Sequence, residues 1–129
     1  MESLSSENKS LALDILCDIQ SAIQTIQERT MKIHSSDDFL ESPEGMILLD
    51  ATCMMLIAIG ESLKNLDKVT KGELLAMDTT IPWKKIKGIR DVIAHHYFDI
   101  DAGQIWWIIS YELKPLQNAI NNFIELLKQ

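Results

Sequence analysis

The spacing of apolar residues in the first half of the chain limits the fold to packed helices. Between residues 8 and 33, apolar side chains recur at steps of four, four, four and three, at Leu11, Ile15, Ile19, Ile23 and Ile26. This spacing places them on one face of a helix. Residues 43–67 form a second helical stretch that is apolar on nearly all sides in its middle. We therefore expect that stretch to be the most buried element.

Capping signals place two further helices in the second half. Residues 79–82 read Thr-Thr-Ile-Pro, which predicts a helix over about 82–97. Asp101, with Gln104 three residues later, predicts the cap of a last helix whose apolar stripe continues to Leu127. Pro115 lies inside that helix and should kink it, because proline removes a backbone hydrogen bond.

The same signals predict the fold class. Residues 70–73 read as a capping box that opens a short helix through Met77. No stretch alternates apolar and polar residues as a half-buried strand would. The sequence therefore predicts an all-α protein, an up-and-down bundle of four to five helices. Residues 1–129 should form a single domain, with residues 1–7 as a flexible N-terminus.

The excess of acidic over basic charge lies in the first part of the chain. The net charge is −7, which by itself argues against a nucleic-acid binder. Residues 1–50 carry ten acidic and three basic side chains, whereas residues 51–129 carry nine of each. The whole-chain charge therefore does not exclude a phosphate-bearing substrate.

Other features indicate a cytoplasmic protein. The N-terminus has no basic start or apolar core, so we expect no signal peptide. The apolar run from Met46 to Ile59 is shorter and more interrupted than a membrane span. Cys17 and Cys53 both lie in apolar helical patterns, where buried free thiols are expected rather than a disulfide or a nucleophile.

Residues 83–97, W-K-K-I-K-G-I-R-D-V-I-A-H-H-Y, hold the densest positive charge in the chain. They include three lysines, one of only two arginines, and two of the three histidines. Histidine is the side chain whose ordinary pKa lies nearest neutral pH, so it suits acid–base chemistry. If the protein has an active site, this segment is the strongest candidate.

The positions of Arg90 and His95 do not fit one straight helix acting alone. At about 100° per residue, they lie about 140° apart around the helix axis. Either the helix end distorts near His95, or a second copy supplies the missing partner across a two-fold axis. Spacing alone is weak support, because Arg29 and His34 are equally far apart but lack a basic run and a following tyrosine.

The surroundings of Arg90 and His95 are more specific. The segment I-P-W-K-K-I-K-G-I-R-D-V-I-A-H-H-Y-F resembles the HepT-like branch of the HEPN superfamily, and so do the earlier I-G-E (residues 59–61) and D-D-F-L (residues 37–40). The resemblance runs in order over residues 8–128. It implies a helical-bundle ribonuclease toxin that is usually homodimeric, with a minimal nucleotidyltransferase as its antitoxin.

The resemblance also implies roles for individual residues. Arg90 and His95 correspond to the catalytic pair, and Asp91 stands at a polar position that is commonly asparagine. Tyr97 corresponds to the tyrosine that such antitoxins adenylylate to silence the toxin. His96 fills a variable position and receives no role.

These residue types suit RNA cleavage without a metal or other cofactor. Histidine can act as base or acid near pH 7, and arginine can hold a phosphate bidentately. Asp91 can orient Arg90 or His95. The three lysines of the segment can contact flanking phosphates, which predicts salt-dependent binding; they are Lys84, Lys85 and Lys87.

Other interpretations remain open at this point. The protein can be a non-catalytic helical companion of a nucleotidyltransferase that binds a nucleotide or substrate, or a plain structural bundle. Arg90 can pair with Glu61, and the lysines can form a solvated face. A metal cluster built from His95, His96, Asp99 and Asp101 lacks the ligand spacing of a zinc site.

Overall fold

The computed structural model describes residues 4–95 and 99–129. Its long helices are α1 (Ser6–Arg29), α3 (Pro43–Thr70) and α7 (Leu113–Lys128). Shorter helices connect them: α2 (Ser36–Leu40), η1 (Leu75–Met77), α4 (Trp83–Lys87), α5 (Ile89–His95) and α6 (Ala102–Trp107), followed by η2 (Ile108–Glu112), a π-helical turn. The described residues contain no strand. The predicted all-α bundle is confirmed.

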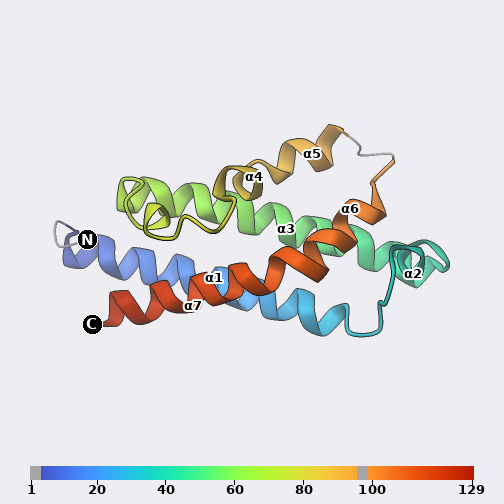
Figure 1. The fold of residues 1–129 in the computed structure, drawn as a ribbon, viewed down its shortest axis with the longest axis horizontal. Helices are drawn as coiled ribbons and strands as arrows, with labels where there is room; N and C mark the ends of the chain where they lie inside the picture. The colour runs from blue at the N-terminus through green and yellow to red at the C-terminus, as the bar shows by residue number, and fades with distance from the viewer. Residues whose placement is uncertain (1–3, 96–98) are drawn as a thin grey trace.

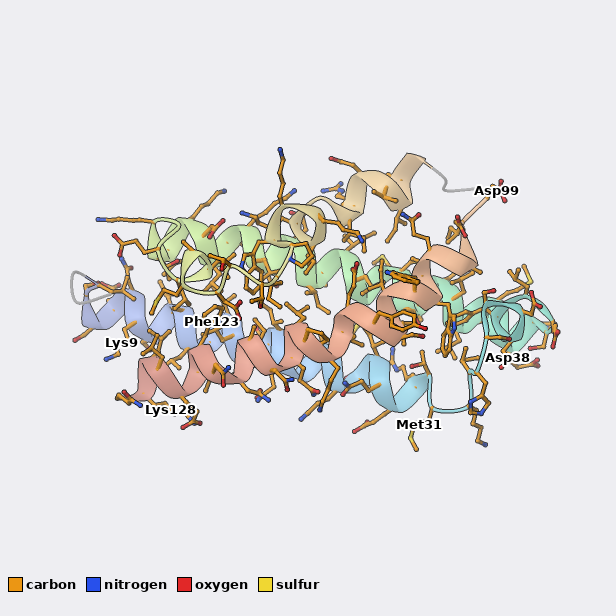
Figure 2. All side chains as sticks on the ribbon, viewed as in Figure 1. Lys9, Met31, Asp38, Asp99, Phe123 and Lys128 are labelled. Carbon is orange, nitrogen blue, oxygen red and sulfur yellow. The ribbon has the colours of Figure 1, made fainter. Side chains whose placement is uncertain are left out.

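The helices run up and down along one long axis (Figure 1). α1 runs in one direction and α3 returns beside it, while α4 and α5 run back along α3 and α6–α7 return toward the chain's start. α1 packs against both α3 and α7. Phe123 of α7 points into the space that these helices enclose (Figure 2) and is buried.

The residues that the sequence indicates as caps of α3 and α6 do cap these helices. Ser42 accepts a hydrogen bond from the backbone N–H of Gly45 (2.9 Å), and Pro43 is the first helical residue. Likewise, Asp101 accepts from the N–H of Gln104 (3.1 Å) at the start of α6. α1 begins at Ser6, capped by Ser5, so it includes the last two residues of the predicted flexible N-terminus.

The prediction of the apolar face of α1 is wrong for the first turns of the helix. Ile19, Ile23 and Ile26 are buried, but Leu11 is exposed and Ile15 is only partly buried. Successive steps of four residues rotate around a helix of 3.6 residues per turn, so the earlier members drift off the core face. Ala12 and Leu16 fill those places.

Thr70 does not open a helix. It is the last residue of α3, and its hydroxyl donates to the carbonyl of Leu66 (2.9 Å). Lys71 (φ 56°) and Gly72 (φ 73°) follow in the left-handed region and end the helix. The predicted capping box is therefore a helix terminus.

Pro115 perturbs the last helix without a simple kink. In a regular α-helix the proline ring would collide with the carbonyl four residues earlier, at Tyr111. Tyr111 lies within the π-helical turn just before α7. The wider turn accommodates the ring, and the buried stripe continues from Leu113 to Leu127 as predicted.

The exposure of the two cysteines differs. Cys53 of α3 is buried, and burial, with a smaller contribution from the Asp50 carboxylate, raises the pKa of its thiol to about 11. Cys17 is exposed, so the expectation that both thiols are buried is wrong for Cys17.

Candidate active site

The basic segment forms two helices where the sequence predicted one. α4 ends at Lys87 and α5 begins at Ile89, with Gly88 between them. Gly60 of α3 makes room for this break: a Cβ atom at Gly60 would lie 2.7 Å from the carbonyl oxygen of Ile86. The break therefore rests directly on the backbone of α3, one residue before Glu61.

Arg90, at the beginning of α5, reaches across to α3. Its Nη1 donates to Oε1 of Glu61 at 3.2 Å. Lys64, one turn further along α3, lies 3.6 Å from the other carboxylate oxygen. The hydrogen bond from Arg90, with help from Lys64, lowers the pKa of the Glu61 carboxyl below its ordinary value. Glu61 is thus ionised at neutral pH and fixes one edge of the guanidinium.

The guanidinium of Arg90 remains accessible. Its side chain is 64% exposed, and the contact with Glu61 uses one nitrogen of three. Arginine presents its N–H groups in a planar fork, so the outer edge can bind a phosphate while the inner edge stays on the carboxylate. Arg90 can therefore pair with Glu61 and bind an anion at the same time.

The structure does not bring the positions of Arg90 and His95 onto one face of α5. The backbone of α5 ends at His95, five residues after Arg90, and the break at Gly88 precedes both. The two positions thus remain about 140° apart around α5. Asp91 is exposed and lies four residues, about one turn, before His95. On a helix, position 91 is therefore closer to position 95 than position 90 is. The side chain of His95 lies outside the described part, as do His96 and Tyr97.

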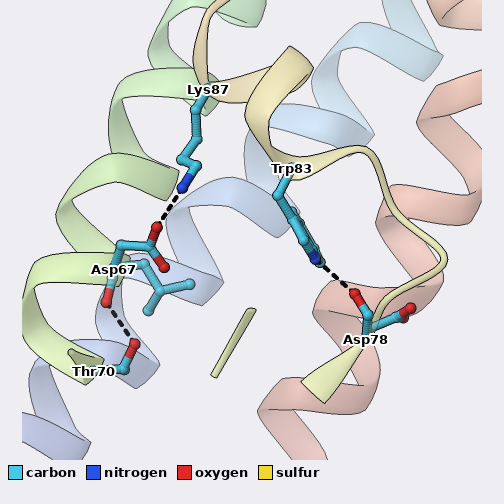
Figure 3. A network of polar contacts seen from close by, with 6 residues as sticks. Asp67, Thr70, Asp78, Trp83 and Lys87 are labelled. Atoms are coloured by element: carbon cyan, nitrogen blue, oxygen red, sulfur yellow. Dashed lines mark hydrogen bonds and ion pairs between the residues drawn. The ribbon is translucent and has the colours of Figure 1, made fainter. Parts of the chain in front are cut away.

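Two of the three lysines hold α4 in place. Lys87 pairs with Asp67 of α3, as Figure 3 shows, and both side chains are about three-quarters buried. Lys85 pairs with Glu112 of the π-helical turn at 2.5 Å. Lys84 is exposed and has no ion-pair partner among the described residues. Of the predicted phosphate contacts, Lys84 is therefore the most available.

Trp83 anchors the beginning of α4. Its indole N–H donates to the carbonyl of Asp78 (2.8 Å; Figure 3), and its ring lies against Phe123 at 5.9 Å between centroids. These two contacts fix the start of α4. Trp106 and Trp107 point to different sides of the last helices, since Trp106 packs on the core and Trp107 is mostly exposed.

Comparison with known proteins assigns the family. Residues 19–123 match the family described as ribonuclease HepT-like. The chain belongs to this family. The match covers both the α3 segment with Glu61 and the α5 segment with Arg90.

Individual relatives agree with this assignment. A protein of Caldanaerobacter subterraneus subsp. tengcongensis named "Putative RNase TTE0752" is 33% identical over 91 residues, which cover 70% of this chain and 75% of that protein. "Probable ribonuclease HepT" of Thermococcus cleftensis is 29% identical over 81% of this chain and 87% of its own. No solved structure matches significantly.

One relative carries a second region. "Gamma-glutamylcyclotransferase and putative RNase MJ0434" of Methanocaldococcus jannaschii is 32% identical over 84% of this chain, but the match covers only 46% of that protein. The HepT-like unit therefore also occurs as part of a longer chain.

Changing Glu61 should test whether it positions Arg90. We expect Glu61→Ala to lower RNA cleavage about fivefold, since exposed ion pairs contribute little and Arg90 keeps its charge. Glu61→Gln keeps an acceptor oxygen and should restore most of that loss. The effect should fall on kcat more than on KM. Equal losses in both variants, or none in either, would contradict a positioning role.

Because the pKa of Glu61 is lowered, its hold on Arg90 should depend on pH. A carboxyl whose pKa is lowered in the folded state contributes stability above its unfolded pKa and loses it as the pH falls through the folded value. Arg90 should therefore be held at neutral pH and released only in acid. Cleavage by the wild type and by Glu61→Gln should differ in pH dependence only on the acid side.

Proposed function

We propose that this protein is a metal-independent endoribonuclease toxin of a toxin–antitoxin pair. The observation that carries the proposal is the exposed, carboxylate-anchored guanidinium of Arg90 at the start of the short helix that ends at His95. Membership of a ribonuclease family supports RNA as the substrate.

The proposed reaction is a transesterification within the RNA. His95 acts as the base or acid: it accepts the proton of a ribose 2′-OH, or donates a proton to the departing 5′-oxygen. The 2′-oxygen forms a bond to phosphorus as the bond from phosphorus to the 5′-oxygen breaks, with no change of oxidation state. Arg90 balances the negative charge on the transferring phosphate, and Lys84 contacts a neighbouring phosphate.

Asp91 is proposed as a supporting residue for His95. Residues four apart on a helix are neighbours, and a carboxylate near an imidazole favours its protonated form. Lys85 and Lys87 are proposed as weaker phosphate contacts, because both already pair with carboxylates of their own chain.

We further propose that the active form is a homodimer in the cytoplasm. Arg90 and His95 lie on different faces of one α5, so a phosphate held by Arg90 of one subunit needs His95 of a second copy. A two-fold axis would then create two equal sites in one cleft.

The purified protein should cleave RNA in the presence of EDTA. A result with cleavage only after a divalent metal is added would overturn the metal-independent mechanism. If no RNA is cleaved under either condition, the alternative of a non-catalytic companion of a nucleotidyltransferase is favoured. The readout is separation of end-labelled RNA fragments on a gel.

Adenylylation of Tyr97 is the proposed means of silencing. The tyrosine oxygen attacks the α-phosphate of ATP, the phenolic proton is lost, and pyrophosphate leaves. The added phosphodiester would place negative charge and bulk beside the basic segment, repelling RNA.

Incubation with ATP and the proposed nucleotidyltransferase antitoxin should add the mass of one AMP, or a multiple of it, and abolish cleavage. Tyr97→Phe should gain no mass and should continue to cleave. Unchanged mass of the wild type would end the regulatory proposal and leave the nuclease proposal standing.

A further inference from the structure

Two aromatic rings lie exposed next to each other near the end of the chain. Trp107 is the last residue of α6, and Tyr111 lies four residues later, in the π-helical turn. Their ring centroids are 4.4 Å apart, with the ring planes inclined by 41°. Trp107 is nevertheless 55% exposed and Tyr111 63% exposed. The rings therefore contact each other and still keep more than half of their surface in water.

The polar groups of this aromatic pair are available to a ligand. The indole N–H of Trp83 donates to a carbonyl of its own chain. Among the described residues, neither the indole N–H of Trp107 nor the hydroxyl of Tyr111 has such a partner. Tryptophan and tyrosine offer a large contact area at a low cost in conformational entropy, so they are enriched in binding surfaces.

The charge beside the aromatic pair favours an anionic ligand. Glu112 follows Tyr111, but its carboxylate is paired with Nζ of Lys85 at 2.5 Å. The Glu112 side chain is only 17% exposed, whereas that of Lys85 is 54% exposed. Residues 102–124 contain no other acidic residue, although the chain as a whole has a net charge of −7. A ligand that approaches the rings thus meets the ammonium group before the carboxylate.

The aromatic pair borders the side of α6 that faces the candidate site. Gln104 of α6 and Val92 of α5 line one apolar cavity, at the end of the molecule where α6 returns past α5 (Figure 1). Trp107 follows Gln104 by three residues, so position 107 lies beside that cavity. His95 follows Val92 by three residues, so position 95 lies beside the same cavity on α5. The aromatic pair and the position of His95 therefore flank the same α5–α6 junction.

The small size of the aromatic pair does not fit a protein interface. A stable interface covers about 800 Å² on each partner. A fully buried tryptophan or tyrosine contributes about 150–250 Å², and these two rings are only partly exposed. Two adjacent rings do match the face of a single planar base.

We propose that Trp107 and Tyr111 form a stacking platform for an unpaired base of single-stranded RNA. This proposal rests on the proposed ribonuclease function and deepens it, because it names the single strand as the substrate. Every base has a flat face that stacks on an aromatic ring, whereas a duplex hides those faces. The bound base would lie next to the phosphate on which His95 acts.

The surrounding charges give the bound strand a direction. α2 also packs against α6, and it carries Asp37 and Asp38, which repel phosphates. The opposite side of the aromatic pair leads to Lys85 and to the exposed Lys84 of α4. The strand should therefore run from the rings toward α4 and α5, and not toward α2.

Loss of either ring should weaken the binding of a single-stranded 2′-O-methyl RNA. This RNA lacks the free 2′-OH that the proposed cleavage needs, so binding is measured without turnover. We expect Trp107→Leu and Tyr111→Leu each to raise Kd by about 5- to 150-fold, the range for losing one base–aromatic stack. Trp107→Phe keeps an aromatic face and should restore most of the affinity. Fluorescence anisotropy of labelled RNA gives the Kd values.

Leu11→Ala is the matched control for these variants. Leu11 is an exposed apolar side chain near the beginning of α1, at the opposite end of the bundle from α6 (Figure 1). This variant should bind the RNA like the wild type. Positions 107 and 111 are exposed as well, so all variants should keep the helical circular dichroism of the wild type. A Trp107→Leu variant that binds as tightly as the wild type would overturn the proposal.

A duplex of the same RNA tests whether the bases are recognised. The wild type should bind the duplex more weakly than the single strand, and Trp107→Leu should bind it as the wild type does, because only phosphates are accessible. A wild type that binds both forms equally well would contradict a stacking platform.

Salt dependence separates stacking from a contact with phosphate. Lys84→Ala should lower the slope of log Kd against log salt concentration by about one. Trp107→Leu should lower the affinity and leave that slope unchanged, because an aromatic ring releases no counterion. An equal change of slope in both variants would mean that Trp107→Leu acts by displacing charges, and the platform would be rejected.

The platform and the nuclease function fail separately in these experiments. If Trp107→Leu loses affinity for the 2′-O-methyl RNA but the wild type cleaves no RNA, the platform stands and the nuclease function is removed. If the wild type cleaves RNA and Trp107→Leu binds normally, the reverse holds. A Trp107→Leu variant with unchanged RNA binding but a changed mass by light scattering would assign the rings to a protein contact instead.

Discussion

Arg90→Ala and His95→Ala should each reduce RNA cleavage by roughly a hundred- to ten-thousandfold, the range for losing an acid–base group or a charge that stabilises the transition state. Arg90→Ala should not unfold the protein, because the Arg90 side chain is mostly exposed and its ion pair contributes little to stability. Cleavage rates and helical circular dichroism are measured on the same preparations.

The chain provides its own matched control for this experiment. Arg29 and His34 have the same spacing as the proposed pair, and both are exposed, Arg29 at the end of α1 and His34 in the segment that follows it. Arg29→Ala and His34→Ala should cleave RNA like the wild type. Cleavage that survives both Arg90→Ala and His95→Ala would remove the catalytic assignment.

Mixing the two inactive variants separates a shared site from a site within one chain. After subunit exchange, half of the dimers contain one copy of each variant. If each site combines Arg90 of one subunit with His95 of the other, one of the two sites in such a mixed dimer is intact. The mixture should therefore regain about one quarter of the wild-type activity. A mixture that stays inactive would place the working pair within a single subunit.

Gly60→Ala should have the largest effect on the fold around the site. Alanine ordinarily stabilises a helix relative to glycine by up to about 1 kcal/mol. Here its Cβ would lie 2.7 Å from the Ile86 carbonyl oxygen and 3.3 Å from Cγ2 of Ile89. The oxygen belongs to the backbone and cannot rotate away, so we expect a net loss of about 1–3 kcal/mol of unfolding free energy.

Gly60→Ala should also weaken RNA cleavage, since it moves α4 and α5 away from α3 and separates Arg90 from Glu61. Gly103→Ala is the comparison, because among the described residues the only atom close to a Cβ at position 103 belongs to the Asp101 side chain. Thermal unfolding should show a lower Tm for Gly60→Ala only. Equal Tm values would mean that α4 and α5 adapt without cost.

The differences between prediction and structure have a common cause. Periodicity located α1, α3 and the stripe of α7, because burying an apolar face requires one spacing whatever the partner is. It could not show that Gly88 divides the basic segment, because that break depends on the contact between α4 and Gly60 of α3. It also could not separate Lys84 from Lys85 and Lys87, whose carboxylate partners are distant in sequence.

For the candidate site too, some properties follow from the sequence and others only from the tertiary structure. The sequence alone determined the helical class, the basic segment and the residue types for acid–base and phosphate chemistry, since these follow from local order and composition. Only the tertiary structure decided that Glu61 holds Arg90, that Arg90 stays accessible, and that Ile47 and Met54 of the apolar helix α3 are exposed. These properties depend on which helices pack together, and a helical repeat shows which face is apolar without showing what covers it.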